Sequence, residues 1–372
     1  MGNGADSPRL VYLSPVPWSS FEQRPHFLVR EFIRQTGGRV LWIDPTPGRL
    51  PRWRDLYRPR PADQTPGRGG CPPVQVLRPR ALPIEPLGVL GGLNAYLWRP
   101  ALASVRQFAG NHQWTLAIGK PGALAASLLR TFRPDLSFYD AMDDFPEFYS
   151  GRSRDTARRL EAEIADRVDR IWVTSRYLER KFSASRRTLL VPNACDPESM
   201  PAPTLHRVHP TVYGYVGTIG DWFDWNVVRL LAEEDDTCEV RLIGPVFARP
   251  SRSLPGNVKL LGSCPHGEIG HNLTRFTAGI IPFRINTLTR AVNPIKYYEY
   301  RAMGLPVLTT PFGEMTAHAA VDKGVFFLES AGSNTEAIAR ALSFRETDPE
   351  VCAFREANRW SVRFDFTPET QT

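Results

Sequence analysis

The sequence lacks several features that would mark a protein as secreted, zinc-bound or membrane-spanning. Its five cysteines are scattered and include no C-x-x-C pair, so neither a disulfide framework nor a zinc site is indicated. Nowhere do 18 apolar residues run together, and the opening residues MGNGAD contain no apolar signal-peptide core. We therefore expect a cytoplasmic protein that is not exported and does not span a membrane.

Lysine is scarce as well, since only five of the 372 residues are lysines and the net charge of +7 comes almost wholly from arginine. An arginine-rich coding bias accounts for that excess except where it clusters. Eight arginines between Arg49 and Arg80 face only Asp55 and Asp63. Nucleic acid and an anionic membrane surface both suit such a segment. Because no recognisable nucleic-acid-binding module accompanies it, we expect no nucleic-acid partner.

The stretch that follows, residues 87–108, is mildly amphipathic. Together with the basic segment it predicts peripheral membrane contact through residues 49–108, on the inner face of the plasma membrane. A buried helix beneath a basic loop is the alternative interpretation.

Short apolar runs alternate with amphipathic helices through both halves of the chain, which is typical of parallel α/β sheets. The first half opens with strands at 10–14 and 40–44 around a helix. No G-x-G-x-x-G follows the first strand, so a bound dinucleotide is not supported. Residues 45–86 are predicted to be irregular.

Four prolines break this alternation near the middle of the chain and indicate a linker over residues 197–210. We predict two Rossmann-like domains, 1–196 and 211–372, with an interdomain cleft. The prediction allows the C-terminal tail to pack back on the first domain.

Two groups of polar residues follow strands of the first domain, where ligands of open α/β sheets bind. The loop 15–24 carries Trp18, Gln23 and Arg24, which either line the cleft or cap the next helix. The strand at 136–139 runs into three carboxylates, Asp140, Asp143 and Asp144.

Crowding of carboxylates raises at least one pKa, which favours a general base. Turn formation and helix capping are other common uses of aspartate. Asp140 directly ends the predicted strand and is suited to hold the turn. Among the three candidates we therefore favour Asp143 as the base.

Residues 294–303 are predicted to form a helix that opens at Pro294 and ends before Gly304. Lys296 adds a full cation to the unpaired N–H groups of the first turn, which suits a diphosphate. Glu299, one turn on, can accept hydrogen bonds from a ribose diol. A surface Lys–Glu pair is the alternative interpretation.

Several motifs, in the expected order over nearly the whole chain, resemble those of bacterial GT-B glycosyltransferases of the group-1 (GT4-like) type, used in exopolysaccharide and cell-wall glycan assembly. They are Gln23-Arg24-Pro25, Tyr139-Asp140-x-x-Asp143-Asp144, Val173-Thr174-Ser175 with Val191-Pro192-Asn193, Gly214-Tyr215-Val216-Gly217, and Asn293-Pro294-x-Lys296-x-x-Glu299-Tyr300-x-Ala302-x-Gly304. The last motif is the most specific.

The resemblance implies a nucleotide-sugar co-substrate and no cofactor. Lys296 would pair with the donor diphosphate, and Glu299 would hold the donor ribose. The full donor-binding set would be Gly217, Thr218, Asn293, Lys296 and Glu299. The acceptor-binding set would be Trp18, Gln23 and Arg24.

One position departs from the family pattern. Many such enzymes carry a second glutamate eight residues before the one matched by Glu299, in contact with the transferred sugar, and this chain has Ala291 there. Arg290 or Asn293 is the candidate to contact the sugar instead, and the anomeric outcome stays open. The chain has no D-x-D triplet, which argues against a metal-dependent GT-A enzyme.

We therefore predict a metal-independent hexosyltransferase that transfers a sugar to a glycan or polyprenyl-diphosphate-linked acceptor. It would act in exopolysaccharide or cell-envelope glycan biosynthesis. The alternatives are a nucleotide-sugar epimerase of the same fold and a non-catalytic sugar-nucleotide-binding protein.

Overall fold

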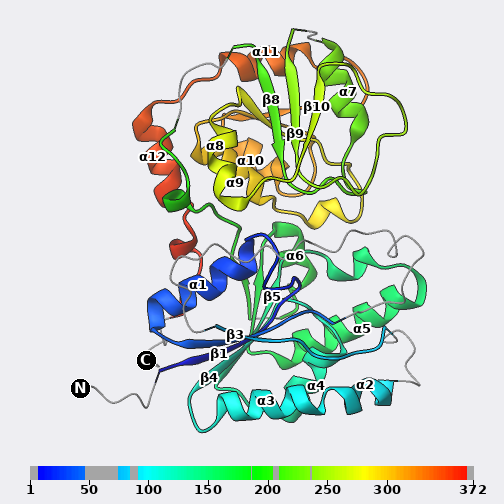
Figure 1. The fold of residues 1–372 in the computed structure, drawn as a ribbon, viewed down its shortest axis with the longest axis vertical. Helices are drawn as coiled ribbons and strands as arrows, with labels where there is room; N and C mark the ends of the chain where they lie inside the picture. The colour runs from blue at the N-terminus through cyan, green and yellow to red at the C-terminus, as the bar shows by residue number, and fades with distance from the viewer. Residues whose placement is uncertain are drawn as a thin grey trace. The chain divides into compact units, whose positions relative to one another are not determined.

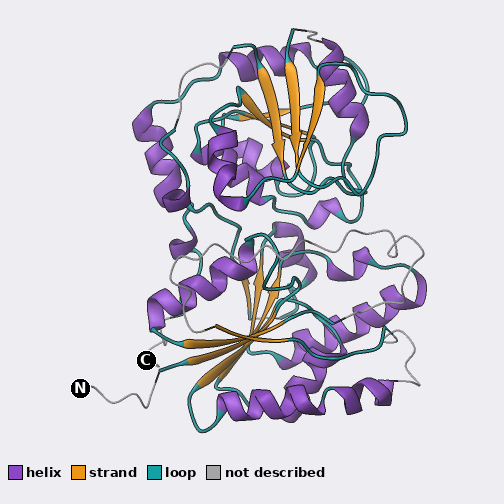
Figure 2. Ribbon diagram, viewed as in Figure 1, coloured by secondary structure: helices purple, strands orange, loops and turns teal. Residues whose placement is uncertain are grey.

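The computed structural model describes residues 7–46, 74–83, 91–185, 187–203, 209–234 and 237–366. The chain divides into two compact units: unit 1 is Met1–Val191 with Phe364–Thr372, and unit 2 is Pro192–Arg363. Figure 1 shows that each unit is a sheet with helices on both faces, and Figure 2 shows the same layers by type of element.

Within the described residues, the sheet of unit 1 has seven parallel strands in the order β3-β2-β1-β4-β5-β6-β7. The inner strands are apolar runs because helices cover both faces, with α1 on one face and α3 and α4 on the other (Figure 1). The strands are β1 (Arg9–Leu13), β2 (Arg39–Ile43), β3 (Val74–Leu77), β4 (Trp114–Ile118), β5 (Leu136–Ala141), β6 (Arg170–Val173) and β7 (Thr188–Leu190). The helices are α1 (Arg24–Thr36), α2 (Gly91–Leu97), α3 (Arg99–Ala109), α4 (Ala123–Thr131), α5 (Gly151–Arg167) and α6 (Arg176–Lys181).

Two predictions for unit 1 were wrong in detail. The segment predicted to be irregular contains β3, a four-residue strand at the edge of the sheet, paired in parallel with β2. Such a short, partly exposed strand lacks the continuous apolar run of an inner strand. The described part of the amphipathic stretch 87–108 forms two helices, α2 and α3, rather than one. Pro100 lies in the first turn of α3, where a missing N–H costs nothing. In the middle of a single helix the same proline would remove a backbone hydrogen bond, which explains the break between α2 and α3.

Unit 2 repeats the arrangement, with six parallel strands among its described residues in the order β10-β9-β8-β11-β12-β13. The strands are β8 (Val212–Val216), β9 (Glu239–Ile243), β10 (Val258–Gly262), β11 (Ala278–Ile281), β12 (Val307–Thr309) and β13 (Val325–Phe327). The helices are α7 (Trp225–Glu234), α8 (Ile269–Leu273), α9 (Ile295–Ala302), α10 (Met315–Val321), α11 (Thr335–Ser343) and α12 (Asp348–Ala357). Of these, α10 and α12 were not predicted.

The division after Val191 comes before the predicted linker at 197–210. Residues that we assigned to the end of the first domain already bond to unit 2. Asn193 Nδ2 donates to the carbonyl oxygen of Asn293 at 2.6 Å, and Cys195 N donates to that of Asn358 at 2.9 Å. The C-terminal tail belongs to unit 1, where the ring of Phe364 lies 5.9 Å from that of Trp172.

Both sheets have a Rossmann-type switch point. In unit 1, the strand that comes first in the chain, β1, lies between β2 and β4, so the chain crosses over from one side of β1 to the other. In unit 2, β8 lies between β9 and β11 in the same way. Ligands of such sheets bind beyond the carboxyl ends of the strands at this point. Most of the predicted site residues lie in the segments that follow those ends.

Candidate functional site

Helix α9 of unit 2 carries two of the predicted donor-binding residues. Its limits agree with the prediction to within one residue. The helix begins at Ile295, so Pro294 is the N-cap and not the first helical residue as predicted. Gly304 follows the C-cap residue Met303 and has a φ of +73°, as expected of a C′ glycine. Lys296 is the second helical residue, so its side chain leaves the first turn, where backbone N–H groups have no intrahelical partner.

The Lys296 ammonium is partly buried between aromatic rings. Its Nζ lies 5.1 Å from the ring centroid of Tyr215 and 5.9 Å from that of Phe283. It makes no hydrogen bond or ion pair with any of the described residues. Burial lowers the pKa of Lys296, and the Glu299 carboxylate offsets part of that shift. A bound anion would compensate the cost of holding this cation out of water.

Gly217 lies directly against this ammonium. It has a φ of +141°, and a Cβ at this position would come within 2.6 Å of Lys296 Nζ, so the position requires glycine. Gly244 lies behind it, where a Cβ would be 2.0 Å from the carbonyl oxygen of Gly217. The Tyr215 hydroxyl donates to the carbonyl oxygen of Thr218 at 2.7 Å and fixes the turn. The structure therefore brings the Gly217-Thr218 turn and Lys296 together.

Asn293 is held within the protein at the start of α9. Its buried side chain donates from Nδ2 to the Tyr298 hydroxyl oxygen at 3.1 Å, and its Oδ1 lies 3.2 Å from His318 Nε2. Its role in donor binding stays a prediction. Ala291 is fully buried, whereas the Arg290 side chain is exposed. Arg290 is therefore the more accessible candidate to contact the transferred sugar.

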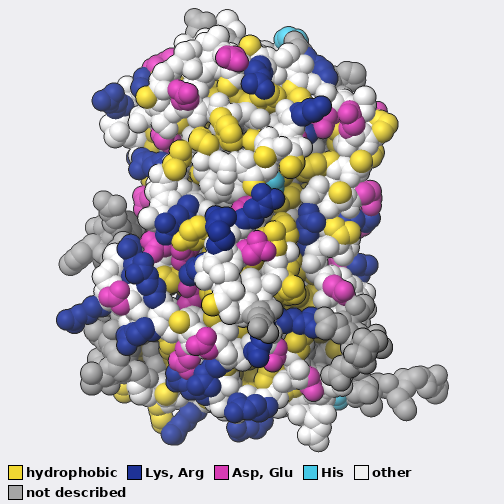
Figure 3. Space-filling view, turned by 180° about the vertical axis from the view of Figure 1, so that it is seen from behind, with side chains coloured by type: hydrophobic (Ala, Val, Ile, Leu, Met, Phe, Trp, Pro, Cys, Tyr) yellow, Lys and Arg dark blue, Asp and Glu magenta, His cyan; other side chains and the backbone are white. Residues whose placement is uncertain are grey.

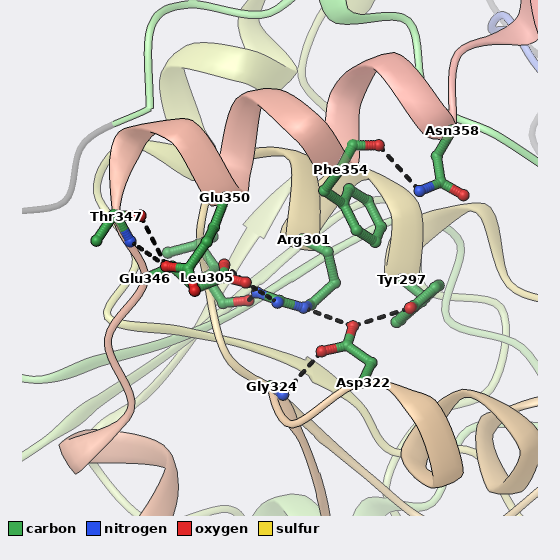
Figure 4. Close-up of polar contacts among 10 residues, drawn as sticks. All are labelled: Tyr297, Arg301, Leu305, Asp322, Gly324, Glu346, Thr347, Glu350, Phe354 and Asn358. Carbon is green, nitrogen blue, oxygen red and sulfur yellow. Dashed lines mark hydrogen bonds and ion pairs between the residues drawn. The ribbon is translucent and has the colours of Figure 1, made fainter.

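A buried ion cluster holds the far end of α9 (Figure 4). The Arg301 side chain is 2% exposed, and its Nε donates to Asp322 Oδ2 at 2.8 Å while Nη1 donates to Glu346 Oε2 at 2.8 Å. Asp322 also accepts from the Tyr297 hydroxyl at 2.9 Å and from Gly324 N at 2.8 Å. The cluster ties the helix that carries Lys296 to the segment before β13 and to the segment before α12.

In unit 1, two predicted site residues pair with each other. Arg24 Nε and Nη2 donate to Asp140 Oδ1 at 2.9 and 2.7 Å, and both side chains are at most 2% exposed. Asp140 does not end its strand as we expected, because β5 continues to Ala141. The Asp140 carboxylate therefore already has a fixed cationic partner. The pair joins α1 to β5.

Asp144 belongs to a second buried network. Lys181 Nζ donates to Asp144 Oδ1 at 2.8 Å, and the Tyr177 hydroxyl donates to Oδ2 at 3.2 Å. Lys181 also bonds to Glu161, which accepts from the Tyr139 hydroxyl at 2.9 Å. The Asp144 carboxylate therefore has a cation and a hydroxyl as fixed partners.

Asp143 differs from both neighbours. Its carboxylate is partly buried and makes no hydrogen bond or ion pair with any of the described residues. Burial, together with the nearby charge of Asp144, raises the pKa of Asp143 to about 6. Such a group is ionised at pH 7 yet basic enough to accept a proton. This geometry supports Asp143 over Asp140 and Asp144 as the general base.

The other residues of the first loop are tied to neighbouring elements. Gln23 is the N-cap of α1, and its N–H donates to His26 Nδ1 at 3.4 Å, so the capping alternative applies to it. Trp18 N donates to Asp44 Oδ1 at 2.8 Å, and the Trp18 ring lies 4.9 Å from that of Trp42. Sequence reasoning missed Asp44 as a residue that positions this loop, although it directly follows β2.

Two further properties concern only the part of the chain that the structure describes. There, no group of three or more His, Cys, Asp and Glu side chains is arranged to hold a metal ion. None of its helices combines the length and the apolar character needed to cross a membrane. Of the segment predicted to touch a membrane, residues 49–73 and 84–90 lie outside the described residues.

Two successive Rossmann-like units define the GT-B class of fold, and solved structures of that class match nearly the whole chain. Sucrose-phosphate synthase from Thermosynechococcus elongatus is similar with a TM-score of 0.70 at 14% identity, over 96% of each chain. HepE from Anabaena, solved in complex with UDP and glucose, is similar with a TM-score of 0.59 at 17% identity, over 96% of this chain and 95% of that one. At these identities the likeness shows the fold, and the GT-B prediction is confirmed.

In sequence, the chain is similar to TuaH from Bacillus subtilis (strain 168), named as a teichuronic acid biosynthesis glycosyltransferase in a name that marks the activity as provisional. The two are 27% identical over 201 residues, which cover 47% of this chain and 50% of TuaH. The match therefore spans about half the length of this curated relative. No protein-family model matches the chain.

Proposed function

We propose that the chain is a glycosyltransferase that moves a hexose from a nucleotide-sugar donor to a glycan or polyprenyl-diphosphate-linked acceptor. The product would be an exopolysaccharide or a cell-envelope glycan. The observation that carries the proposal is the Lys296 ammonium, which makes no ion pair with the described residues and lies beside the Gly217 turn of a GT-B fold. The name of TuaH and the UDP and glucose bound to HepE support this class of reaction.

In this reaction Lys296 and the first-turn N–H groups of α9 stabilise the leaving diphosphate without a metal ion. Glu299 accepts hydrogen bonds from the donor ribose, and the glycine turn lets the phosphates approach the backbone. Asp143 removes the proton of the acceptor hydroxyl as it attacks. Equal transfer rates with and without a chelator are expected.

The first prediction is that Lys296→Ala weakens UDP, GDP or ADP binding by about 1.5–3 kcal/mol, the range for a hydrogen bond to a charged group. The fold should persist, because the ammonium makes no hydrogen bond or ion pair with the described residues. Calorimetric titration measures the affinity. Lys323→Ala, at an exposed lysine of the same unit, is the matched control and should bind as the wild type does.

Unchanged nucleotide affinity in Lys296→Ala would refute the donor site. The same titration with nucleotide sugars identifies the donor. Transfer to a glycan or lipid-linked acceptor would exclude the epimerase alternative. Donor binding with neither transfer nor hydrolysis, even at high protein concentration, would favour the non-catalytic alternative.

We propose peripheral membrane contact through α2 and Leu82, on the cytoplasmic side. Leu82, Leu93 and Tyr96 are 42%, 52% and 65% exposed, and the buried Asn94 side chain bonds to both backbone groups of Leu82, which holds Leu82 against α2. The Arg99 guanidinium lies 4.9 Å from the Tyr96 ring centroid. Exposed apolar side chains beside arginines suit an anionic membrane interface.

This contact predicts binding to vesicles that contain anionic lipid at low salt, with release at high salt because surface charge is screened. Tyr96→Ser should weaken sedimentation with these vesicles. Val321→Ser, at an 82% exposed apolar residue of unit 2, should not. If the wild type stays in solution at low salt, the membrane contact is refuted. Figure 3 shows one face of the molecule, on which Lys and Arg side chains are interspersed with Asp and Glu.

A further inference from the structure

Unit 1 has a polar pocket that the proposed reaction does not use. It has a volume of about 440 Å³ and lies between α3 and the strands β1, β2 and β3. Arg9 and Arg39, which line it, are the first residues of β1 and β2. The pocket is therefore at the amino ends of these parallel strands, away from the carboxyl ends that precede Asp44 and Asp143.

Two arginines lie side by side in this pocket. Arg9 and Arg39 are register partners in the parallel pair β1 and β2, so their side chains leave the same face of the sheet. Neither makes an ion pair with any described residue, and no carboxylate lines the pocket. Two like charges are therefore held together with no counter-ion among the described residues.

Arg9 is also incompletely bonded. One of its terminal nitrogens donates to the carbonyl oxygen of Phe108 at the end of α3, but its Nε is buried and has no hydrogen-bond partner among the described residues. Burial, and then the charge of Arg39, lowers the pKa of Arg9. A buried donor without a partner costs stability unless a ligand or water supplies the acceptor.

We propose that this pocket binds a phosphate group. Guanidinium groups match the geometry of phosphate oxygens, and Arg9 and Arg39 place two of them in the lining of one pocket. The amide side chains of Gln75 and Gln107 line the same pocket, and Leu41 and Phe108 give it an apolar wall. The ligand is therefore a free phosphate or the phosphate headgroup of a lipid whose apolar part meets that wall.

The test uses the full chain with Lys296→Ala in the background, which removes the proposed donor site as a source of phosphate binding. Inorganic phosphate is titrated by calorimetry, and binding to vesicles with phosphatidic acid is compared with binding to vesicles with phosphatidylserine of equal charge. Arg39→Gln should reduce phosphate or phosphatidic acid affinity by about tenfold or more. The Arg39 side chain is exposed, so the fold should persist.

Arg106→Gln is the matched control, because Arg106 is an exposed arginine of α3 that does not line the pocket. Loss confined to free phosphate assigns the pocket to a soluble ligand, and loss confined to phosphatidic acid assigns it to a lipid headgroup. The proposal is overturned if neither probe binds, or if Arg106→Gln and Arg39→Gln reduce binding equally. Neither result bears on the donor site, which Lys296→Ala tests in the otherwise unchanged chain.

Discussion

Asp143→Asn is expected to lower the turnover of sugar transfer by about two to four orders of magnitude, the usual contribution of a positioned general base. Asparagine keeps the size of the side chain but cannot accept the proton. The affinity for the nucleotide sugar should stay nearly unchanged, because the donor residues lie in unit 2 and Asp143 in unit 1. Steady-state kinetics with separate donor titration measures both quantities.

The pH profile gives an independent check of this role. The pKa of Asp143 is raised to about 6, so the base is protonated and inactive below that pH. Turnover of the wild type should therefore fall as the pH drops through about 6, and the residual activity of Asp143→Asn should lose this limb.

The neighbouring carboxylates are the controls. Asp140→Asn and Asp144→Asn break the bonds to Arg24 and Lys181, so they should destabilise the fold more than they change the chemical step. If only one of these two variants lowers turnover, the site stands but the base is misassigned. If all three variants keep near-normal turnover, a retaining reaction in which the donor phosphate takes the proton is the better account.

Helix α9 could be predicted from the sequence because its signals are local. A proline before the first turn and a glycine after the last confine the helix, and each acts through its own backbone conformation. Lys296 and Glu299 follow from their spacing on that helix. The inner strands are equally local, since a strand buried on both faces is a short apolar run.

The pairing of Arg24 with Asp140 could not be predicted in this way. The two residues are 116 positions apart, and only the packing of α1 against the sheet brings them together. From the sequence, each was assigned a separate role in the site. The same holds for Lys181, which neutralises Asp144. Distinguishing Asp143 within the cluster required these long-range partners.

The missed helix α12 had a local signal that was overlooked. Thr347 and Glu350 form a capping box, in which Thr347 N donates to Glu350 Oε2 at 2.7 Å. The strand β3 had no comparable signal, because its four residues lie at the edge of the sheet and are only partly buried.

Arg301→Met is expected to lower the free energy of unfolding by about 3–5 kcal/mol, because removing one partner of a buried ion cluster leaves the others uncompensated. Asp322 and Glu346 are 11% and 14% exposed and would lose their shared cation. Chemical denaturation measures the change. Arg229→Met is the matched control, because the partly exposed ion pair of Arg229 with Glu233 at the protein surface should contribute no more than about 1 kcal/mol.

The pH dependence separates lost charge pairing from lost packing. Burial alone would raise the pKa of Asp322, but the bond and charge of Arg301 outweigh it, so the pKa is lowered below its ordinary value of 3.8. A lowered folded-state pKa contributes stability above pH 3.8 that is lost as the pH falls further. Arg301→Met should therefore unfold with a shallower dependence on pH below 4. If the variant is destabilised with an unchanged acid dependence, the cost is packing of the side chain.

A loss of unfolding free energy under 1 kcal/mol in Arg301→Met would show that the ion cluster does not hold α9. The position of Lys296 would then depend on Tyr300, whose hydroxyl accepts from Val216 N at 3.1 Å.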